Sequence, residues 1–91
     1  MQNNEIDKKK LAELRSRSKL LDPIVRIGKN GVNENLLNDI KIHLKKRRLI
    51  KIKLLRSALS SGSIDDVIKA VITDCSCILI DRIGLTFSVY R

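Results

Sequence analysis

Two glycines three positions apart mark the segment of this sequence best suited to bind a ligand. They enclose a lysine and an asparagine in the turn Gly28-Lys29-Asn30-Gly31. Glycine accepts left-handed backbone angles and lets a ligand approach the main chain closely. An expected helix follows, and the unpaired N–H groups and positive dipole end of a helix N-terminus favour phosphate. The pattern predicts a phosphate-binding loop, although tight turns without a ligand show the same spacing. No GxxxxGK[ST] pattern occurs, so nucleotide hydrolysis has no support.

Positive charge is concentrated in the part of the chain that carries this turn. The 91 residues contain 19 Lys and Arg against 10 Asp and Glu, a formal net charge of +9. Residues 1–56 hold 16 of these cations and 6 of the acids, whereas residues 57–91 hold 3 and 4. Such a one-sided excess favours a polyanionic partner. The candidate cations are Arg26 before the turn and, after it, Lys45, Lys46, Arg47, Arg48, Lys51 and Lys53, continued by Arg56. A solvated face or a nuclear-import signal is the alternative for the short cluster at 45–48.

Catalytic and metal chemistry find little support. His43 is the one histidine, and no nucleophile or orienting acid is tied to it by spacing. His43, Cys75 and Cys77 are too few ligands for a four-ligand zinc site. Both thiols are expected to be reduced and buried. Phe87 and Tyr90 are the only aromatic residues, which excludes a site of several stacked rings. We therefore expect no enzyme, no catalytic residue, no metal and no cofactor.

Local patterns predict the elements that must position the turn. Pro23 ends a weakly amphipathic first helix, and Asn33 is the expected N-cap of the second. Ser63 and Asp66 have the spacing of a capping box before a third helix of clear three- and four-residue periodicity. The expected order αβαβαββ comprises helix 6–20, strand 24–27, helix 33–48, strand 49–55, loop 57–63, helix 64–75 and a hairpin of strands 77–81 and 85–90. We expect one α/β domain over residues 1–91, with a four-stranded sheet packed by helices and residues 1–4 frayed.

Membrane association and secretion are not indicated. The longest apolar runs are far shorter than the 18 or more residues that cross a bilayer. The N-terminal residues lack the apolar stretch of a secretory signal, so the mature chain is expected to begin near Met1. We expect a cytoplasmic monomer with no small-molecule substrate.

Three sequence blocks resemble a known family. LDPIVRIGKNGV (21–32), RLIKIK (48–53) and IGLTFSVYR (83–91) are similar to the signature blocks of the YhbY family, the chloroplast RNA splicing and ribosome maturation (CRM) domain. The resemblance covers the chain from about Asp7 onwards. Two positions depart from the family pattern: Ser76 stands where glycine is common, and Ser18 where a small apolar residue is frequent. Neither belongs to the turn.

The resemblance implies a compact α/β fold akin to the C-terminal domain of translation initiation factor three. It also implies RNA binding through the GxxG loop (residues 28–31) and a basic surface, with Arg15 and Lys19 of the first helix flanking the loop. Stand-alone bacterial members of the family associate with precursors of the large ribosomal subunit, and plant members act in intron splicing.

Non-catalytic binding of structured RNA is therefore the expected function, with ribosomal RNA or a pre-ribosomal particle as partner. Two aromatic rings offer few platforms for base stacking, so affinity is expected to come mainly from phosphate contacts. Two alternatives stay open. One is a DNA-binding or chromatin-like protein, which the charge permits equally. The other is a protein–protein adaptor that uses the third helix and the hairpin, where the net charge is close to zero.

Overall fold

Four short strands form one mixed sheet in the order β1-β2-β4-β3. The computed structural model describes residues 7–91, apart from the side chain of Ser61; the predicted fraying of residues 1–4 lies outside this range. β1 is parallel to β2, and β4 is antiparallel to both β2 and β3. The elements are α1 (Lys8–Lys19), β1 (Val25–Ile27), α2 (Glu34–Arg47), β2 (Leu49–Leu54), a 3-10 helix η1 (Arg56–Ser61), α3 (Ile64–Cys75), β3 (Ile78–Ile83) and β4 (Thr86–Tyr90). The predicted αβαβαββ order and four-stranded sheet are confirmed.

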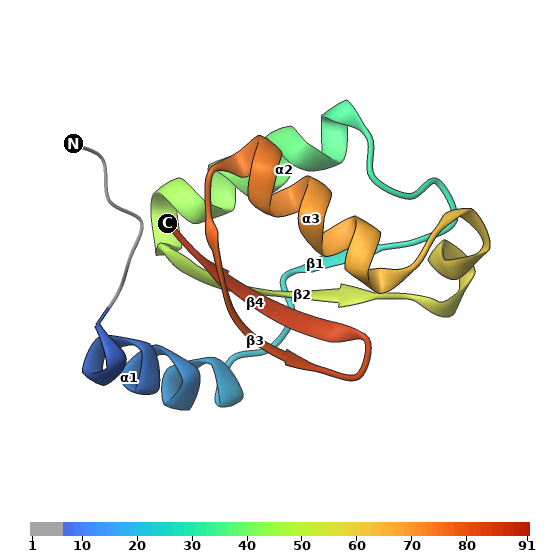
Figure 1. Cartoon of the computed structure of the whole chain (residues 1–91). Helices are drawn as coiled ribbons and strands as arrows, with labels where there is room; N and C mark the ends of the chain where they lie inside the picture. Colours follow the sequence, from blue (N-terminus) through green and yellow to red (C-terminus); the bar gives the residue numbers. More distant parts are fainter. Residues whose placement is uncertain (1–6) are drawn as a thin grey trace.

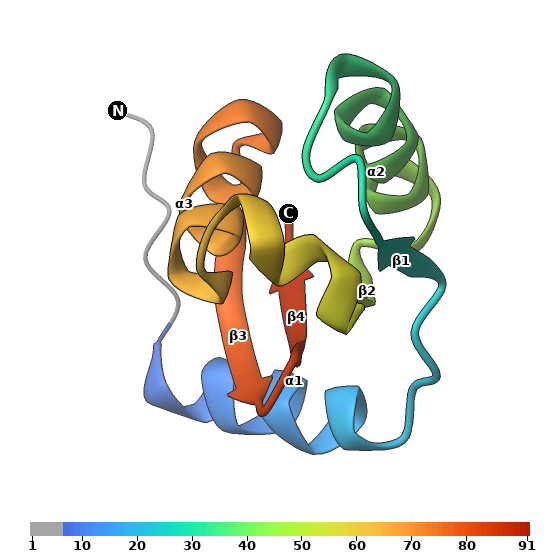
Figure 2. The same cartoon turned by 90° about the vertical axis from the view of Figure 1, so that its right-hand side faces the viewer.

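Helices cover both faces of the sheet. α2 and α3 lie on one face, and α1 lies across the other (Figures 1 and 2). Side chains of each strand point alternately to the two faces of the sheet. The larger core lies between the sheet and the helices α2 and α3. Its sheet side is built from Val25, Ile27, Ile50, Ile52, Leu54, Phe87 and Val89. A smaller core of Leu14, Leu49 and Ile80 attaches α1 to the opposite face.

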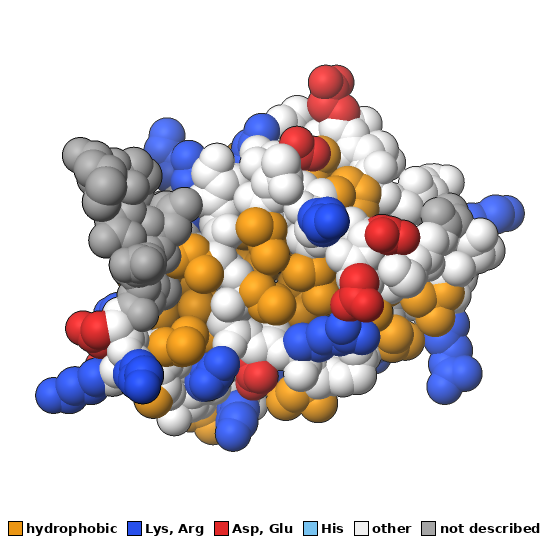
Figure 3. Space-filling view, viewed as in Figure 1, with side chains coloured by type: hydrophobic (Ala, Val, Ile, Leu, Met, Phe, Trp, Pro, Cys, Tyr) orange, Lys and Arg blue, Asp and Glu red, His pale blue; other side chains and the backbone are white. Residues whose placement is uncertain are grey.

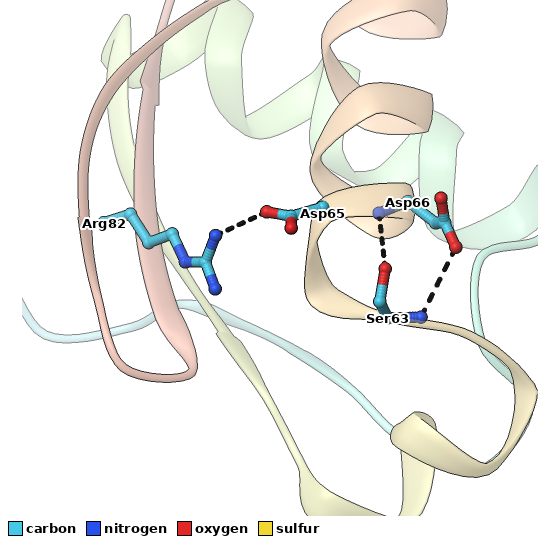
Figure 4. Close-up of polar contacts among 4 residues, drawn as sticks. All are labelled: Ser63, Asp65, Asp66 and Arg82. Carbon is cyan, nitrogen blue, oxygen red and sulfur yellow. Dashed lines mark hydrogen bonds and ion pairs between the residues drawn. The ribbon is translucent and has the colours of Figure 1, made fainter.

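Side-chain caps fix where the helices begin. Asp7 and Asn33 each accept a hydrogen bond from a backbone N–H three residues further on, which starts α1 and α2. Before α3, the Ser63 side chain accepts from the Asp66 N–H, and the Asp66 carboxylate accepts from the Ser63 N–H (Figure 4). The predicted cap at Asn33 and the capping box are therefore confirmed. Arg82 of β3 reaches across to form an ion pair with Asp65 in the first turn of α3 (Figure 4).

One sequence prediction is wrong, and another needs an addition. Residues 57–63 are not a plain loop, because residues 56–61 form the 3-10 helix η1, with Ala58 buried against the larger core. Alternation along the last strand predicts that Phe87 and Val89 face the core and that Ser88 faces away from it. Ser88 does face away from the larger core, but it is buried on the side that α1 covers. Strand periodicity shows which side chains share a face of the sheet. It does not show whether a helix from another part of the chain covers that face.

Both departures from the family pattern have a local explanation. Ser76 has φ of +52° in the left-handed region, where glycine is least strained, and it ends α3. Ser18 is buried, and its hydroxyl donates a hydrogen bond of 2.8 Å to the Arg15 carbonyl. A hydroxyl can therefore replace a small apolar group at this position, because its hydrogen-bonding capacity is satisfied within α1.

Candidate nucleic-acid interface

The GxxG loop leaves the end of β1 as a tight turn. The Gly31 N–H donates a hydrogen bond of 2.9 Å to the Gly28 carbonyl, and Gly31 has φ of +65°. Lys29 and Asn30 are exposed at the tip, whereas both glycines are half-buried. The left-handed backbone angle at Gly31 explains the second glycine. At Gly28 an added Cβ would be 3.6 Å from a Leu55 methyl carbon, so the missing side chain there faces the protein.

The N-terminus of α2 is less open to a phosphate than the sequence suggested. α2 begins three residues after Gly31, at Glu34. The Asn33 side chain already accepts the Leu36 N–H at 2.9 Å, and Glu34 places a carboxylate in the first turn. Asparagine and glutamate both satisfy or compensate the positive end of the helix. The basic side chains around the loop are therefore better suited to hold an anion than the helix terminus.

Three cations flank the loop. Arg26 of β1 and Lys53 of β2 are register partners on the face opposite the larger core, immediately before the loop begins. Arg56 opens η1, which lies against the loop because the Leu55 N–H donates 2.8 Å to the Ile27 carbonyl. All three cations are exposed. Arg56 was seen in the basic run but was not among the candidate site residues, because the run gave no sign that the chain turns back to the loop there.

A polar hollow of about 330 Å³ extends this basic region beneath the sheet. It lies on the α1 side, between the C-terminal end of α1 and the sheet. Its cations are Lys19, Lys51 and Lys53, and its acids are Asp22 and Asp81. The structure thus brings Lys19 of α1 together with the β2 lysines, and no residue of the GxxG loop is among the described residues that line this hollow.

Arg15 lies elsewhere. Its Nε donates 3.1 Å to the Ile80 carbonyl of β3, at the irregular position where the β3–β4 register shifts. β3 is the edge strand opposite β1, so Arg15 is separated from the loop by the width of the sheet. The structure gives this arginine a role in attaching α1 to β3, and it does not place it beside the loop.

The basic cluster 45–48 also lies away from the loop. It occupies the last turn of α2 and the residue that follows, whereas the loop lies at the first turn of the same helix. Fourteen helical residues span about 20 Å. Figure 1 shows these two ends of α2 on opposite sides of the molecule, with the C-terminus beside the cluster. The candidate cations therefore form two groups, and the sequence had suggested one.

Few of these cations are neutralised within the protein. Between residues 7 and 91 the ion pairs are Lys10–Glu13 and Arg82–Asp65, neither of which involves a candidate site residue. Figure 3 shows Lys and Arg side chains along the α1 edge and at the far right end, with hydrophobic side chains gathered between them over α3 and β3. An array of unpaired cations attracts polyanions, and no ion pair within the protein has to break when a polyanion binds.

Burial limits what the aromatic rings and the two thiols can contact. Phe87 is buried in the larger core, so among the described residues only Tyr90 offers a partly exposed ring. Cys75 and Cys77 are both buried free thiols, and burial raises the pKa of Cys77 to about 12. Within residues 7–91 no three His, Cys, Asp or Glu side chains gather as a metal site, and no helix is long and apolar enough to cross a membrane.

Lys41 and Arg91 are basic residues near the 45–48 cluster that sequence reasoning missed. Both line a hollow with Lys45 and Arg48. The i, i+4 spacing of Lys41 and Lys45 on one helix face was a usable signal. No sequence signal placed Arg91 near this cluster, since its position depends on the pairing of β4 with β2.

Comparisons with known proteins give one consistent family. The family model of the CRS1 / YhbY (CRM) domain matches residues 6–91. "Probable RNA-binding protein YqeI" of Bacillus subtilis is 35% identical over 78 residues, which cover 86% of this chain and 79% of that protein. "Probable RNA-binding protein MJ0652" of Methanocaldococcus jannaschii is 27% identical over 78 residues; the match spans 58% of that longer protein and 86% of this chain.

A solved structure has the same fold. It is the solution structure of the hypothetical protein SAV1595 from Staphylococcus aureus, described as "a putative RNA binding protein". The two chains share 30% sequence identity and superpose with a TM-score of 0.75, covering 96% of this chain and 88% of that one. The α1–sheet–α2/α3 arrangement is therefore shared with a relative.

Proposed function

The chain belongs to the CRS1 / YhbY (CRM) domain family, and on this premise we propose that it is a non-catalytic RNA-binding protein that acts as one domain. Its proposed partner is ribosomal RNA or a pre-ribosomal particle of the large subunit, bound in the cytoplasm by a monomer. The observation that carries the proposal is the exposed GxxG loop flanked by cations that have no acidic partner within residues 7–91. The names of the two relatives and of the solved structure support RNA as the ligand class.

Phosphate contact is the proposed source of affinity. The loop places Lys29 and Asn30 toward solvent, where an ammonium group and an amide can both donate to phosphate oxygens. Arg26 and Lys53 extend the positive surface along β1 and β2, and Lys19 and Lys51 continue it into the polar hollow. Phosphate contacts position a protein on nucleic acid without reading its sequence. We therefore infer that this surface recognises the shape and backbone of the RNA.

Salt dependence tests the proposed mechanism directly. If about six phosphates are neutralised, the logarithm of the association constant falls by about 4 to 5 for each tenfold rise in salt concentration. Fluorescence anisotropy with a labelled ribosomal RNA fragment, measured at several salt concentrations, gives this slope. An affinity that does not change with salt contradicts phosphate binding.

A loop variant tests the proposed contact. Lys29→Ala combined with Asn30→Ala removes both exposed polar side chains of the tip and leaves the two glycines and the Gly28–Gly31 hydrogen bond in place. We expect weaker RNA binding and an unchanged melting temperature. Lys69→Ala, which removes one exposed charge from α3, is the matched control. Equal affinity of the loop variant and this control would reduce the GxxG segment to a structural turn.

Duplex DNA is the main competitor for a basic surface of this kind. The 2′-hydroxyl distinguishes RNA from DNA, and A-form geometry distinguishes the two duplexes. Competition of unlabelled duplex DNA against bound RNA decides between them: efficient competition at equal nucleotide concentration favours the DNA-binding alternative. A pull-down whose protein partners survive nuclease treatment would instead favour an adaptor that binds through α3 and the hairpin.

A further inference from the structure

We propose that the far end of α2 is a second contact site for RNA backbone, so that one RNA is held at both ends of the molecule. This inference rests on the proposed function. It assigns a role to cations that lie too far from the GxxG loop to contact the same phosphates. The site, called here the α2-end hollow, is lined by Lys41, Ile42, Leu44, Lys45, Arg48 and Arg91.

The α2-end hollow has the composition of an anion site. Its volume is about 530 Å³, and of the six residues between positions 7 and 91 that line it, four are cationic and none is acidic. Asp74 and two of the hollow's cations, Lys41 and Arg91, all act electrostatically on the buried Cys75 thiol, so one acid lies in the same region. Four positive charges around one concave surface attract phosphate more strongly than the same charges spread over a flat one.

Arg48 is held in place by the fold. Its backbone has φ of +69°, which is unusual for a residue with a side chain, and two hydrogen bonds fix it there. The Arg48 N–H donates 2.8 Å to the Leu44 carbonyl, and the Arg91 N–H donates 3.0 Å to the Arg48 carbonyl. The second bond joins the start of β2 to the end of β4, so two cations distant in sequence are fixed side by side.

Tyr90 adds a further constraint on the same side chain. The Arg48 guanidinium lies 5.9 Å from the centre of the Tyr90 ring, and Lys10 of α1 lies at the same distance from that ring. A guanidinium held on an aromatic face loses less freedom when it binds a phosphate. Arg48 is also the C-cap of α2, so the backbone conformation that ends the helix occurs at a residue that lines the hollow.

The separation of the two sites determines what they can bind. The GxxG loop precedes the first turn of α2, whereas the α2-end hollow covers the second half of the helix, so the two sites are separated by up to about 20 Å along the helix axis. The GxxG loop of a related fold clamps about four backbone nucleotides, so a four-nucleotide RNA held by the loop has no further backbone to offer to the α2-end hollow. A longer or folded RNA can occupy both. The geometry therefore favours a structured RNA that presents two backbone segments over a short single strand.

The test compares two charge-matched variants on two RNAs. Lys41→Gln combined with Lys45→Gln removes two cations of the hollow and keeps Arg48. The control, Lys8→Gln combined with Lys69→Gln, removes two exposed cations that line neither site. Anisotropy is measured at several salt concentrations with an RNA of about 4 nucleotides and a structured RNA of about 16 or more.

With the longer RNA, two lost phosphate contacts should flatten the slope of log K against log salt by about 1.4 to 1.8. If the two proteins bind equally at about 1 M salt, this corresponds to about 25- to 60-fold weaker binding at about 0.1 M. With the short RNA the two variants should bind alike. If the double variant does not fold, Arg91→Gln, which lies outside any helix, is measured instead. It removes one cation of the hollow, so it should flatten the slope by about half as much.

The possible results separate this inference from the proposed function. Wild-type protein that binds neither RNA overturns both. RNA binding that the hollow variant and the control reduce equally overturns only the second site. A polyglutamate peptide that binds the wild type but not the hollow variant, with RNA affinity unchanged, would assign the hollow to an acidic protein and overturn the inference as well.

Discussion

The two glycines of the GxxG loop should respond oppositely to the same substitution. Gly31 has φ of +65°, and a left-handed residue with a Cβ costs roughly 1–2 kcal/mol. Alanine also lowers the conformational entropy of the unfolded chain, which stabilises the folded state by about 0.4–1 kcal/mol. The net loss for Gly31→Ala is therefore about 1 kcal/mol, which lowers the melting temperature by about 4–8 °C in a domain of this size.

Gly28→Ala is the matched control within the same loop. Gly28 is not in the left-handed region, and an added Cβ would meet Leu55 and Ser57 at 3.6 and 3.8 Å, which are ordinary contacts. We expect the melting temperature to stay the same or to rise, because alanine reduces the entropy of the unfolded chain. The new methyl faces η1, so the exposed tip at Lys29 and Asn30 keeps its shape and RNA affinity should be retained.

Thermal unfolding followed by circular dichroism, with RNA anisotropy on the same samples, measures both effects. Gly31→Ala should lose stability and RNA affinity together, since the turn that presents the tip is distorted. If Gly31→Ala is as stable as Gly28→Ala, the left-handed turn is not the conformation in solution. If Gly31→Ala is destabilised but binds RNA as tightly as the wild type, the shape of the loop does not matter for binding.

Further perturbations test the fold that positions the loop. Leu14→Ala empties the centre of the smaller core, where the leucine is fully buried, and should cost about 2–5 kcal/mol by urea denaturation; a loss below 1 kcal/mol would mean that α1 is not firmly attached. Ser63→Ala breaks the capping box and should cost about 1 kcal/mol in the same assay, and an unchanged midpoint would contradict the cap. Arg82→Gln removes an ion pair with the exposed Asp65 and should cost less than about 1 kcal/mol, so a larger loss would show that the pair is not a surface interaction. Burial raises the pKa of Cys77 to about 12, so the unfolded chain loses this proton at lower pH than the folded one, and stability should fall as pH rises above about 9; Cys77→Ala should reduce that fall, and an equal fall in this variant would assign it to other groups.

The order of the elements was predictable because its signals are local, although the bounds were not all correct: the predicted strand 77–81 is β3 at Ile78–Ile83. Asn33 and the Ser63–Asp66 pair mark helix starts through bonds that span three residues. The alternation of Ile50 and Ile52 with Lys51 showed which side of β2 is buried, since successive side chains point to opposite faces. The turn at residues 28–31 was also visible, because glycine spacing reports a backbone requirement of the turn itself.

The 3-10 helix η1 was missed because its sequence carries no such local signal. Its sequence, RSALSS, has only Ala58 and Leu59 as apolar residues and carries no periodic pattern over six residues. Ala58 is buried because β2 delivers the chain to the edge of the larger core, which is a tertiary effect. Short 3-10 segments depend on such surroundings more than on propensity.

The sequence determined by itself that the chain is basic on one part, that a glycine turn separates a strand from a helix, and which residues of each element are apolar. It could not determine which cations share a surface. The tertiary structure placed Arg26 beside Lys53 through parallel pairing, and Arg91 beside Arg48 through antiparallel pairing. It also placed the cluster 45–48 a full helix length from the loop, although the two are close in sequence. Distances between side chains depend on strand order, register and helix direction, and each of these is fixed only when distant segments pack together.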